Sequence, residues 1–480
     1  MNVLKNFLYN AGYQLFIIIV PLILSPYVSR VVGPSGIGMY SYTYSITVLF
    51  GLFANLGVLK YGNREISGCK DDREKRSRIF AELMAVKFVC GIVTLLVFLC
   101  YCHFFSGIYE SVFYLQIPTL LYYVLDVTWF FWGMQEFRIT TVVCIIAKVL
   151  SVVLIFIFVK SGADTGKYIF ILAVTTLIIQ LLLWIRIPGY VNFKFSINRI
   201  WNRHWRGMLL LFFPVLARYL YITMDKIMIG HMSGMTEVGY YENVQSVTTT
   251  MINALNALGD VVMPQMTLYF SQKRKREAEQ LFDMSYHLIT FLAVGIMFGF
   301  IGIADSFIPW FYGDKFRSSV PLLQMIAPLV LLTGYSDMIR NVFLLPRYKD
   351  KEYLIALIGG AVLNFIINFN LIPRMQSTGA VIGTLATEFF VFAVQTWFVR
   401  ADFKFVYYLK KTALYCVFGS SILIPCYFIR NLTDSLMLNI FWDILAGSVL
   451  YTGCVLVYIR FFEKNIMDNI VERCRKWLKR

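Results

Sequence analysis

Charged residues, histidines and paired cysteines are scarce in this sequence. Asp, Glu, Lys and Arg make up 15% of its 480 residues, and it has only four histidines. Its nine cysteines include no C-x-x-C pair, which removes the usual pattern of a zinc site and leaves no disulfide framework. H-E-x-x-H, nucleophile-elbow and dinucleotide fingerprints are also missing. We therefore expect no metal site, no cofactor and none of these catalytic centres.

Long hydrophilic segments are missing too, which excludes a separate soluble domain. The apolar stretches are separated by connections of no more than about 20 residues. GADTGK at 162–167 imitates a phosphate-binding loop, but its glycines are one residue too close and Tyr168 replaces the required Ser or Thr. Any function must therefore be carried by the apolar segments and their short connections.

Apolar surface is what the sequence has in abundance. Hydrophobic residues make up 58% of the chain, aromatic residues 17%, and mean hydropathy is +0.66. A helix of about 20 apolar residues crosses the roughly 30 Å hydrocarbon layer of a membrane. These features predict an all-α polytopic membrane protein with about 14 transmembrane helices. The predicted spans are 9–30, 37–59, 79–104, 112–133, 139–159, 167–187, 208–230, 240–263, 281–304, 320–342, 352–372, 377–399, 412–430 and 438–460.

The basic residues are distributed unevenly between alternate connections. With both termini in the cytoplasm, 32 of the 44 Lys and Arg residues fall on the cytoplasmic side, seven on the outer side and five inside spans. This asymmetry is the one that orients membrane proteins. The net charge of +16 therefore follows from topology, so we expect contact with anionic lipid of the bilayer and no nucleic acid partner.

A short motif occurs twice, 201 residues apart, and indicates an internal repeat. Gly33-x4-Gly38-x-Tyr40 joins the first two spans, and Gly234-x4-Gly239-x-Tyr241 joins the seventh and eighth. Each copy follows a span that contains an internal proline. Six spans separate the copies, an even number, so both face the same side of the membrane.

The repeat predicts two six-helix lobes related by an axis along the membrane normal. The N-terminal lobe is expected over 1–207 and the C-terminal lobe over 208–411. Spans 13 and 14, with a basic cytoplasmic tail, form an appended part over 412–480.

Polar residues inside the predicted spans are the clearest functional candidates, because they normally face a partner or a water-filled cavity. One face of span 8 is polar along its length, which favours a cavity lining over a hydrogen-bonded seam between helices. This face carries Glu242, Gln245, Thr249, Asn253, Asn256 and Asp260. On span 7, Arg218, Tyr221 and Asp225 also share a face.

The remaining intramembrane charges have several readings. Lys87 and Lys148 lie about two turns inside their spans, where they can line a cavity or reach the membrane surface. Asp126 is expected in a polar core or a cavity lining, whereas Asp337 and Arg340 are expected to pair locally.

Together these residues predict a transporter with a central cavity that favours anions. Arg30, Lys87, Lys148 and Arg218 would make the cavity cationic, and arginine binds phosphate through two parallel hydrogen bonds. The candidate substrate-binding residues are Arg30, Lys87, Lys148, Arg218, Tyr221, Asn253 and Asn256. The carboxylates of Asp126, Asp225, Asp260 and Glu388 are candidates for coupling to a proton or sodium gradient.

Four stretches in order carry a family resemblance. They are SPYVSRVVGPSGIGMYSY (25–42), LGVLKYGNREIS with DDREKRSRIFAEL (56–83), MDKIMIGHMSGMTEVGYY (224–241) and LLPRYKDKEYLIALIGGAVLNFIINFNLIPRMQSTGAVIGTLATE (344–388). Together they resemble the Wzx-type oligosaccharide flippases. These form the polysaccharide transporter branch of the MOP superfamily, which also contains MATE exporters and the lipid II flippase. The resemblance extends from about residue 1 to 400 and is weaker over spans 13 and 14.

The resemblance implies a MATE-like fold with a V-shaped central cavity. It implies alternating-access transport of an undecaprenyl-diphosphate-linked oligosaccharide from the inner to the outer leaflet of a bacterial cytoplasmic membrane, for O-antigen, capsule or exopolysaccharide assembly. It implies that Arg30 receives or releases the diphosphate, and that Arg64 and Glu65 help gate the cytoplasmic side. Asp225 matches the Asp of the family's D-x-I-M-I-G stretch. A polysaccharide polymerase and glycosyltransferases of the same pathway are the expected partners.

Three alternatives remain open at this point. A MATE-like exporter of cationic drugs would share the architecture, but it favours an acidic cavity. A lipid II flippase would differ only in its substrate. A membrane enzyme of the same pathway, such as a polymerase or ligase, would need larger outer loops than the longest one expected here, at about 305–319.

Overall fold

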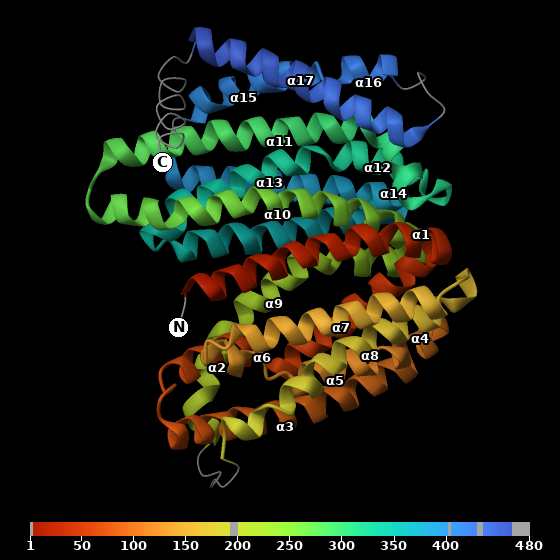
Figure 1. Cartoon of the computed structure of the whole chain (residues 1–480), viewed down its shortest axis with the longest axis vertical. Helices are drawn as coiled ribbons and strands as arrows, with labels where there is room; N and C mark the ends of the chain where they lie inside the picture. Colours follow the sequence, from red (N-terminus) through yellow and green to blue (C-terminus); the bar gives the residue numbers. More distant parts are fainter. Residues whose placement is uncertain (1–2, 193–199, 402–404, 430–434, 463–480) are drawn as a thin grey trace. The chain divides into compact units, whose positions relative to one another are not determined.

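The computed structural model describes residues 3–192, 200–401, 405–429 and 435–462 (Figure 1). Within these ranges the regular structure is helical and contains no strand, which confirms the predicted all-α class. The chain forms two compact units, residues 1–239 and residues 240–480.

Unit 1 is built from nine α-helices in its described part. They are α1 (Val3–Asn55), α2 (Val58–Ser67), α3 (Arg73–Phe105), α4 (Glu110–Leu115), α5 (Ile117–Leu125), α6 (Thr128–Gly133), α7 (Phe137–Phe158), α8 (Thr165–Trp184) and α9 (Ile200–Met232). Helix α1 contains the first predicted span and most of the second, with a sharp bend at Gly33. Gly33 has φ 75° there, which a glycine adopts without steric cost, and Pro34 starts the second segment.

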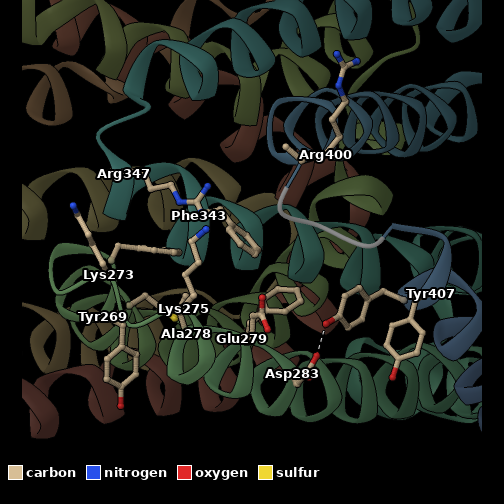
Figure 2. A pocket seen from close by; sticks show the side chains of 15 residues that line it. Tyr269, Lys273, Lys275, Ala278, Glu279, Asp283, Phe343, Arg347, Arg400 and Tyr407 are labelled. Atoms are coloured by element: carbon tan, nitrogen blue, oxygen red, sulfur yellow. Dashed lines mark hydrogen bonds between the residues drawn. The ribbon is translucent and has the colours of Figure 1, made fainter.

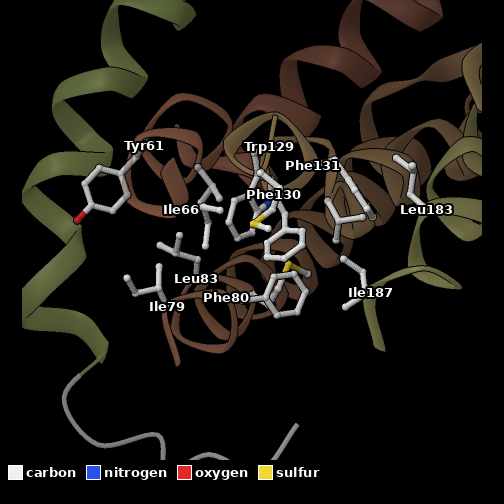
Figure 3. Close-up of a cluster of buried hydrophobic side chains, with 14 of the residues drawn as sticks. Tyr61, Ile66, Ile79, Phe80, Leu83, Trp129, Phe130, Phe131, Leu183 and Ile187 are labelled. Atoms are coloured by element: carbon white, nitrogen blue, oxygen red, sulfur yellow. The ribbon is translucent and has the colours of Figure 1, made fainter. Parts of the chain in front are cut away.

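A cluster of aromatic rings fixes α6 against α2 and α3 in unit 1 (Figure 3). Phe80 lies 5.7 Å from Trp129 and 5.2 Å from Phe130 between ring centroids. Gly62 lets α2 approach, because a Cβ at that position would lie 2.4 Å from the Trp129 ring. Each such ring pair adds about 0.5–1.5 kcal/mol beyond simple burial. The cluster thereby holds the short α6 in place next to the break between α5 and α6.

Unit 2 contains most of α10 and the seven α-helices that follow it in the described chain. They are α10 (Met235–Ser271), α11 (Lys275–Tyr312), α12 (Ser319–Ile326), α13 (Pro328–Ile339), α14 (Asp350–Val399), α15 (Phe405–Ser420), α16 (Leu423–Ile429) and α17 (Leu436–Phe462). Helix α14 contains two predicted spans, which meet at a bend where Gln376 has φ 54°.

The last helices of unit 2 are docked onto α11. The Tyr286 hydroxyl of α11 donates to the carbonyl oxygen of Tyr408 at 2.6 Å, and it lies 2.7 Å from the Thr412 hydroxyl of α15. On α17, the Tyr451 ring stacks on Phe291 at 5.1 Å, and its hydroxyl donates to the Phe291 carbonyl oxygen. The appended pair is therefore fixed to its unit by both polar and aromatic contacts.

Within the described residues, each of the fourteen predicted spans lies mostly on helix. Ten helical segments of the described chain are long and apolar enough to cross a membrane. Helix α1 contains the first span and most of the second, and α14 contains two spans. The fourth span is divided among α4, α5 and α6, and α10 is not among the ten apolar segments because it carries many polar residues. The protein is thus a multi-pass membrane protein, and the count of fourteen crossings stays a prediction.

The boundary between the units lies one helix beyond the predicted lobe boundary at 207/208. Helix α9, which contains the seventh predicted span, packs on α1, α2 and α3 and so belongs to unit 1. Gly57 permits the closest approach, because a Cβ there would lie 2.5 Å from the Met208 carbonyl oxygen. Compact packing and sequence repetition are separate properties, so the lobes at 1–207 and 208–411 stay a prediction.

Candidate functional site

A buried ion pair between Lys87 and Asp126 lies at the centre of unit 1. The Lys87 side chain of α3 is fully buried, and Asp126 is 3% exposed. The Lys87 ammonium donates to the Asp126 carbonyl oxygen at 2.6 Å and lies 3.8 Å from carboxylate Oδ2. Lys87 therefore lines no cavity in this conformation, because its charge is enclosed with that of Asp126.

Two amide side chains complete the surroundings of the Asp126 carboxylate. Asn55, the last residue of α1, donates to Oδ2 at 3.1 Å, and Gln180 of α8 donates to Oδ1 at 3.1 Å. The backbone N–H of Thr128 also donates to Oδ1, at 2.9 Å. The carboxylate thus gathers four helices of unit 1, and both of its oxygens accept hydrogen bonds.

This network sits at a break in the fourth predicted span. Helix α5 ends at Leu125 and α6 begins at Thr128, so the backbone carbonyls at the break lose their helical partners. The Trp184 indole donates to the Leu125 carbonyl oxygen at 2.8 Å, and the Trp129 indole donates to that of Asp126 at 3.0 Å. Non-helical backbone survives at membrane depth only where protein groups satisfy it in this way.

A second buried polar cluster was missed by the sequence analysis. His204 of α9 is fully buried, with Nε2 2.8 Å from the Glu82 carboxylate and Nδ1 2.9 Å from the Tyr61 hydroxyl. The cluster ties the start of α9 to α2 and α3. A signal for it was present, because Glu82 is an ionisable residue inside the predicted span 79–104.

Three of the predicted cavity cations have exposed side chains in the described structure. Arg30 lies on α1 one turn before the Gly33 bend, Lys148 on α7 and Arg218 on α9. Helices α7 and α9 both pack on α1. On α7, Lys148 lies on the face opposite a stripe of exposed apolar residues: Val142, Ile146, Val149, Val153 and Ile157. These three cations therefore come from α1 and from two helices of the same unit that pack on it.

The residue next to Arg218 fixes the position of α9 against α1. The Tyr219 hydroxyl donates to the Ser45 carbonyl oxygen of α1 at 2.6 Å. Tyr221, one turn beyond Arg218, is half-buried, whereas Asp225 is only 2% exposed. The predicted face of the seventh span thus changes from exposed to buried along α9.

The polar stripe of α10 is left partly uncovered by its own unit. Thr249 and Asn253 are exposed, and Asn256 is half-buried. The neighbouring face of the helix is buried and contains Val244, Thr248, Ile252 and Leu255. The Asp260 side chain lies outside the described part of the structure.

Glu388, Arg64, Glu65 and the Asp337–Arg340 pair complete the predicted residues. Glu388 is 8% exposed on α14, in unit 2. Arg64 and Glu65 are consecutive on α2, with their charged groups 3.9 Å apart, and the Arg64 guanidinium lies 5.4 Å from the Tyr61 ring centroid. Asp337 and Arg340 form an ion pair of 2.7 Å, which confirms the predicted local pairing.

Neither a metal site nor a phosphate-binding loop appears in the parts of the chain that the structure describes. No group of three or more His, Cys, Asp or Glu side chains there is placed to hold a metal ion. In the GADTGK stretch, the Lys167 ammonium lies 2.6 Å from the Asp164 carboxylate and holds the pKa of Asp164 well below its usual value. Its first three residues form a capped turn between α7 and α8, and the other three begin α8.

Comparison with known proteins places these features in a family. Residues 3–270 match the family described as polysaccharide biosynthesis protein. A putative O-antigen transporter of Escherichia coli K12 is 24% identical over 415 residues, which cover 83% of this chain and 97% of that relative. A probable low-salt glycan biosynthesis flippase of Haloferax volcanii is 24% identical over 50% of this chain and 51% of its own length.

Solved structures with the same fold belong to two kinds of transporter. The lipid II flippase MurJ in an inward closed conformation superposes with a TM-score of 0.72, at 13% identity, over 95% of this chain and 99% of that one. An inward-facing MATE multidrug transporter gives 0.62, at 14% identity, over 81% and 95%. These likenesses establish the fold. The chain belongs to the polysaccharide biosynthesis protein family and is a Wzx-type flippase of the MOP superfamily.

Proposed function

We propose that this flippase moves an undecaprenyl-diphosphate-linked oligosaccharide repeat unit from the inner to the outer leaflet of a bacterial cytoplasmic membrane. The observation that carries the proposal is the match to O-antigen transporters of Escherichia coli and Shigella dysenteriae over 97% and 96% of their lengths. The product would feed O-antigen, capsule or exopolysaccharide assembly. A polysaccharide polymerase and glycosyltransferases would then act in the same pathway, and both termini would lie in the cytoplasm.

The exposed cations support a diphosphate-bearing substrate. Arg30, Lys148 and Arg218 place three positive charges on α1 and on two helices that pack on it, with Lys148 and Arg218 inside their predicted spans and Arg30 at the outer end of the first span. Leaving such charges in hydrocarbon costs several kcal/mol each, so they favour a hydrated cavity that receives an anion. Arginine is suited to this role because its guanidinium binds phosphate oxygens in pairs.

The uncovered stripe of α10 supports the binding of the sugars. Asn253 and Asn256 present amide groups that both donate and accept hydrogen bonds, as sugar hydroxyls require. Tyr221 of α9 would add a hydroxyl and a ring face. The polyprenyl tail would remain in lipid while the polar head group crosses.

Alternating access gives the substrate a path that avoids hydrocarbon. In the described conformation the segment of α1 around Gly38 is in tight contact with the first turn of α10 around Gly239, and both lie on the predicted outer side. Outward opening would separate these two helix segments. Arg64 and Glu65, on the predicted cytoplasmic side, would change partners as that side closes.

Coupling to a proton or sodium gradient would act through the buried carboxylates. A proton or Na⁺ bound at Asp126 would compete with the Lys87 ammonium for the same carboxylate. Release of Lys87 would weaken the network that holds the break between α5 and α6. Asp225, Glu388 and Asp260 are further candidates for the coupling group.

A reconstituted flipping assay tests the proposal. Purified protein in liposomes receives a labelled undecaprenyl-diphosphate oligosaccharide, and the variants Arg30→Ala and Arg218→Ala are compared with wild type. Lys315→Ala is the matched control, since it removes one exposed positive charge from the predicted outer side outside the cavity. We expect flipping by wild type and Lys315→Ala, and a loss of at least tenfold in both arginine variants with folding intact.

Two results would contradict the proposal. Wild type that flips lipid II but not the oligosaccharide substrate would assign the chain to peptidoglycan synthesis. Wild type that moves neither lipid, but exports ethidium under a proton gradient, would assign it to drug export and leave Arg30 as an anchor at the interface.

A further inference from the structure

A hollow of about 820 Å³ opens in unit 2 where α10 ends and α11 begins (Figure 2). Its wall is formed by the last turn of α10, the first turns of α11, the turn after α13, the end of α14 and the start of α15. None of the predicted site residues lines it. We refer to it as the α10–α11 pocket.

Positive charge predominates in the wall of the α10–α11 pocket. Four cationic side chains and two carboxylates line it: Lys273, Lys275, Arg347 and Arg400 against Glu279 and Asp283. Figure 2 shows the Lys275 side chain extending toward the guanidinium of Arg347, while Arg400 points away. The Arg400 guanidinium lies 3.8 Å from the centroid of the Trp397 ring. Lys275 and Arg347 are therefore the cations that converge on the pocket.

Aromatic contacts hold Arg347 in this position. Its guanidinium carbon lies 4.3 Å from the centroid of the Phe270 ring and 5.4 Å from that of Phe343. A guanidinium held over aromatic faces keeps its full charge and loses little rotamer freedom when it binds a further partner. Lys275 is exposed and begins α11, so its ammonium can adjust to a ligand.

The carboxylates in and near the wall have partners of their own. Asp283 accepts a hydrogen bond from the hydroxyl of Tyr408, which lines the same pocket. Glu277 pairs with Arg274 at 2.8 Å, and this hydrogen bond lowers the pKa of Glu277, so that pair is neutral as a whole. Glu279, one turn after Lys275, is the remaining negative group of the wall. Lys275 and Arg347 line the same pocket, so an anion bound between them would be attracted by both positive charges.

The position and the remaining wall of the pocket suit a ligand at the membrane surface. The predicted apolar span of α11 begins at residue 281, six positions after Lys275. Tyr269, Phe270, Phe282 and Tyr407 add aromatic surface to the same wall. Aromatic residues with basic residues are typical of the layer in which lipid headgroups lie.

We propose that the α10–α11 pocket binds the phosphate group of an anionic ligand, between the Lys275 ammonium and the Arg347 guanidinium. The headgroup of an anionic phospholipid is the source that fits the membrane-surface position, and a soluble phosphate ester would offer the same chemistry. The site shares no residue with the exposed cations of unit 1. It would bind its ligand whatever substrate the flippase carries.

The test measures ligand binding to purified full-length protein in detergent by native mass spectrometry. Dioleoylphosphatidylglycerol is the lipid probe, dioleoylphosphatidylcholine the zwitterionic control, and glycerol 3-phosphate the soluble probe. The variants are Lys275→Gln and Arg347→Gln. Arg276→Gln is the matched control, because it removes one charge from the adjacent exposed position of α11 that does not line the pocket.

We expect one saturable site for phosphatidylglycerol, with affinity reduced about fivefold or more in Lys275→Gln and Arg347→Gln and unchanged in Arg276→Gln. The same variant pattern with glycerol 3-phosphate would support the phosphate site and identify a soluble source. An equal reduction in Arg276→Gln, or equal binding of phosphatidylcholine, would overturn the proposal, because general surface charge or detergent exchange would then explain it. Lys275→Gln alters an exposed side chain, so it decides the outcome even if Arg347→Gln fails to fold.

Discussion

Gly38 and Gly239 stand in reciprocal contact within unit 1. A Cβ on Gly38 would lie 1.7 Å from the carbonyl oxygen of Met235, and a Cβ on Gly239 would lie 1.9 Å from that of Pro34. Positions 34 and 235, like 38 and 239, are 201 residues apart, so each copy of the repeated motif contacts the other in the same way. Such an exchange of equivalent contacts is typical of a two-fold relation and supports the predicted parallel repeat.

Replacement of either glycine should therefore force the second segment of α1 and the first turn of α10 apart. A methyl group in Gly38→Ala or Gly239→Ala meets backbone rather than a movable side chain, and we expect a loss of stability of about 1–3 kcal/mol. Thermal unfolding of the purified variants measures it. Gly453→Ala on α17 is the control, since nothing lies within 4 Å of its added Cβ. Equal melting of Gly38→Ala and Gly453→Ala would show that the contact does not form in solution.

The Lys87–Asp126 pair predicts strong coupling between two mutations. Asp126→Asn leaves the Lys87 ammonium buried without its counter-charge. Lys87→Met likewise leaves the Asp126 carboxylate buried without its counter-charge. We expect each single change to destabilise the protein by about 3–5 kcal/mol. The double variant Lys87→Met/Asp126→Asn should be more stable than the sum of the two losses predicts.

A double-mutant cycle in thermal or denaturant unfolding measures this coupling. Lys315→Met serves as the control for the loss of one exposed lysine, with an expected change within about 0.5 kcal/mol. Additive losses in the cycle would mean that Lys87 and Asp126 do not interact as charges. A flipping assay on the double variant then reports separately on whether the pair is needed for transport.

The buried histidine predicts a further loss of stability. His204→Ala removes one hydrogen bond from the Glu82 carboxylate and one from the Tyr61 hydroxyl, and the loss of a buried hydrogen bond of this kind costs about 1–3 kcal/mol. His231→Ala, at the exposed end of the same helix, is the matched control and should melt like wild type. If His204→Ala also melts like wild type, the cluster contributes nothing to the attachment of α9.

Local patterns made the helices and one ion pair predictable from the sequence. Asp337 and Arg340 are three residues apart on one helix, so their pairing follows from helical spacing alone. The positive φ of Gly33 and Gly234 likewise follows from glycines placed between apolar spans. In each case the relevant partners lie within a few residues along the chain.

Contacts between distant parts of the chain were not predictable in the same way. Lys87 could equally have faced a cavity, since its partner Asp126 lies 39 residues away and depends on how α3 packs against the break after α5. His204 lies outside every predicted span, so nothing local indicated that it would be buried. A single sequence shows that a charged residue lies in an apolar segment and therefore needs a partner. It does not show which helix supplies that partner.

The polar stripe of α10 predicts a loss of transport without a loss of stability. Asn253 is exposed, so Asn253→Leu should change the free energy of unfolding by no more than about 0.5 kcal/mol. If its amide binds a sugar hydroxyl during transport, the loss of that hydrogen bond should slow flipping about tenfold, which corresponds to 1.4 kcal/mol. Ala254→Leu, an exposed alanine well away from the stripe around the helix, is the matched control and should flip normally. Flipping that falls equally in both variants would mean that added bulk on α10 is responsible, whereas normal flipping in Asn253→Leu would exclude its amide from the substrate path.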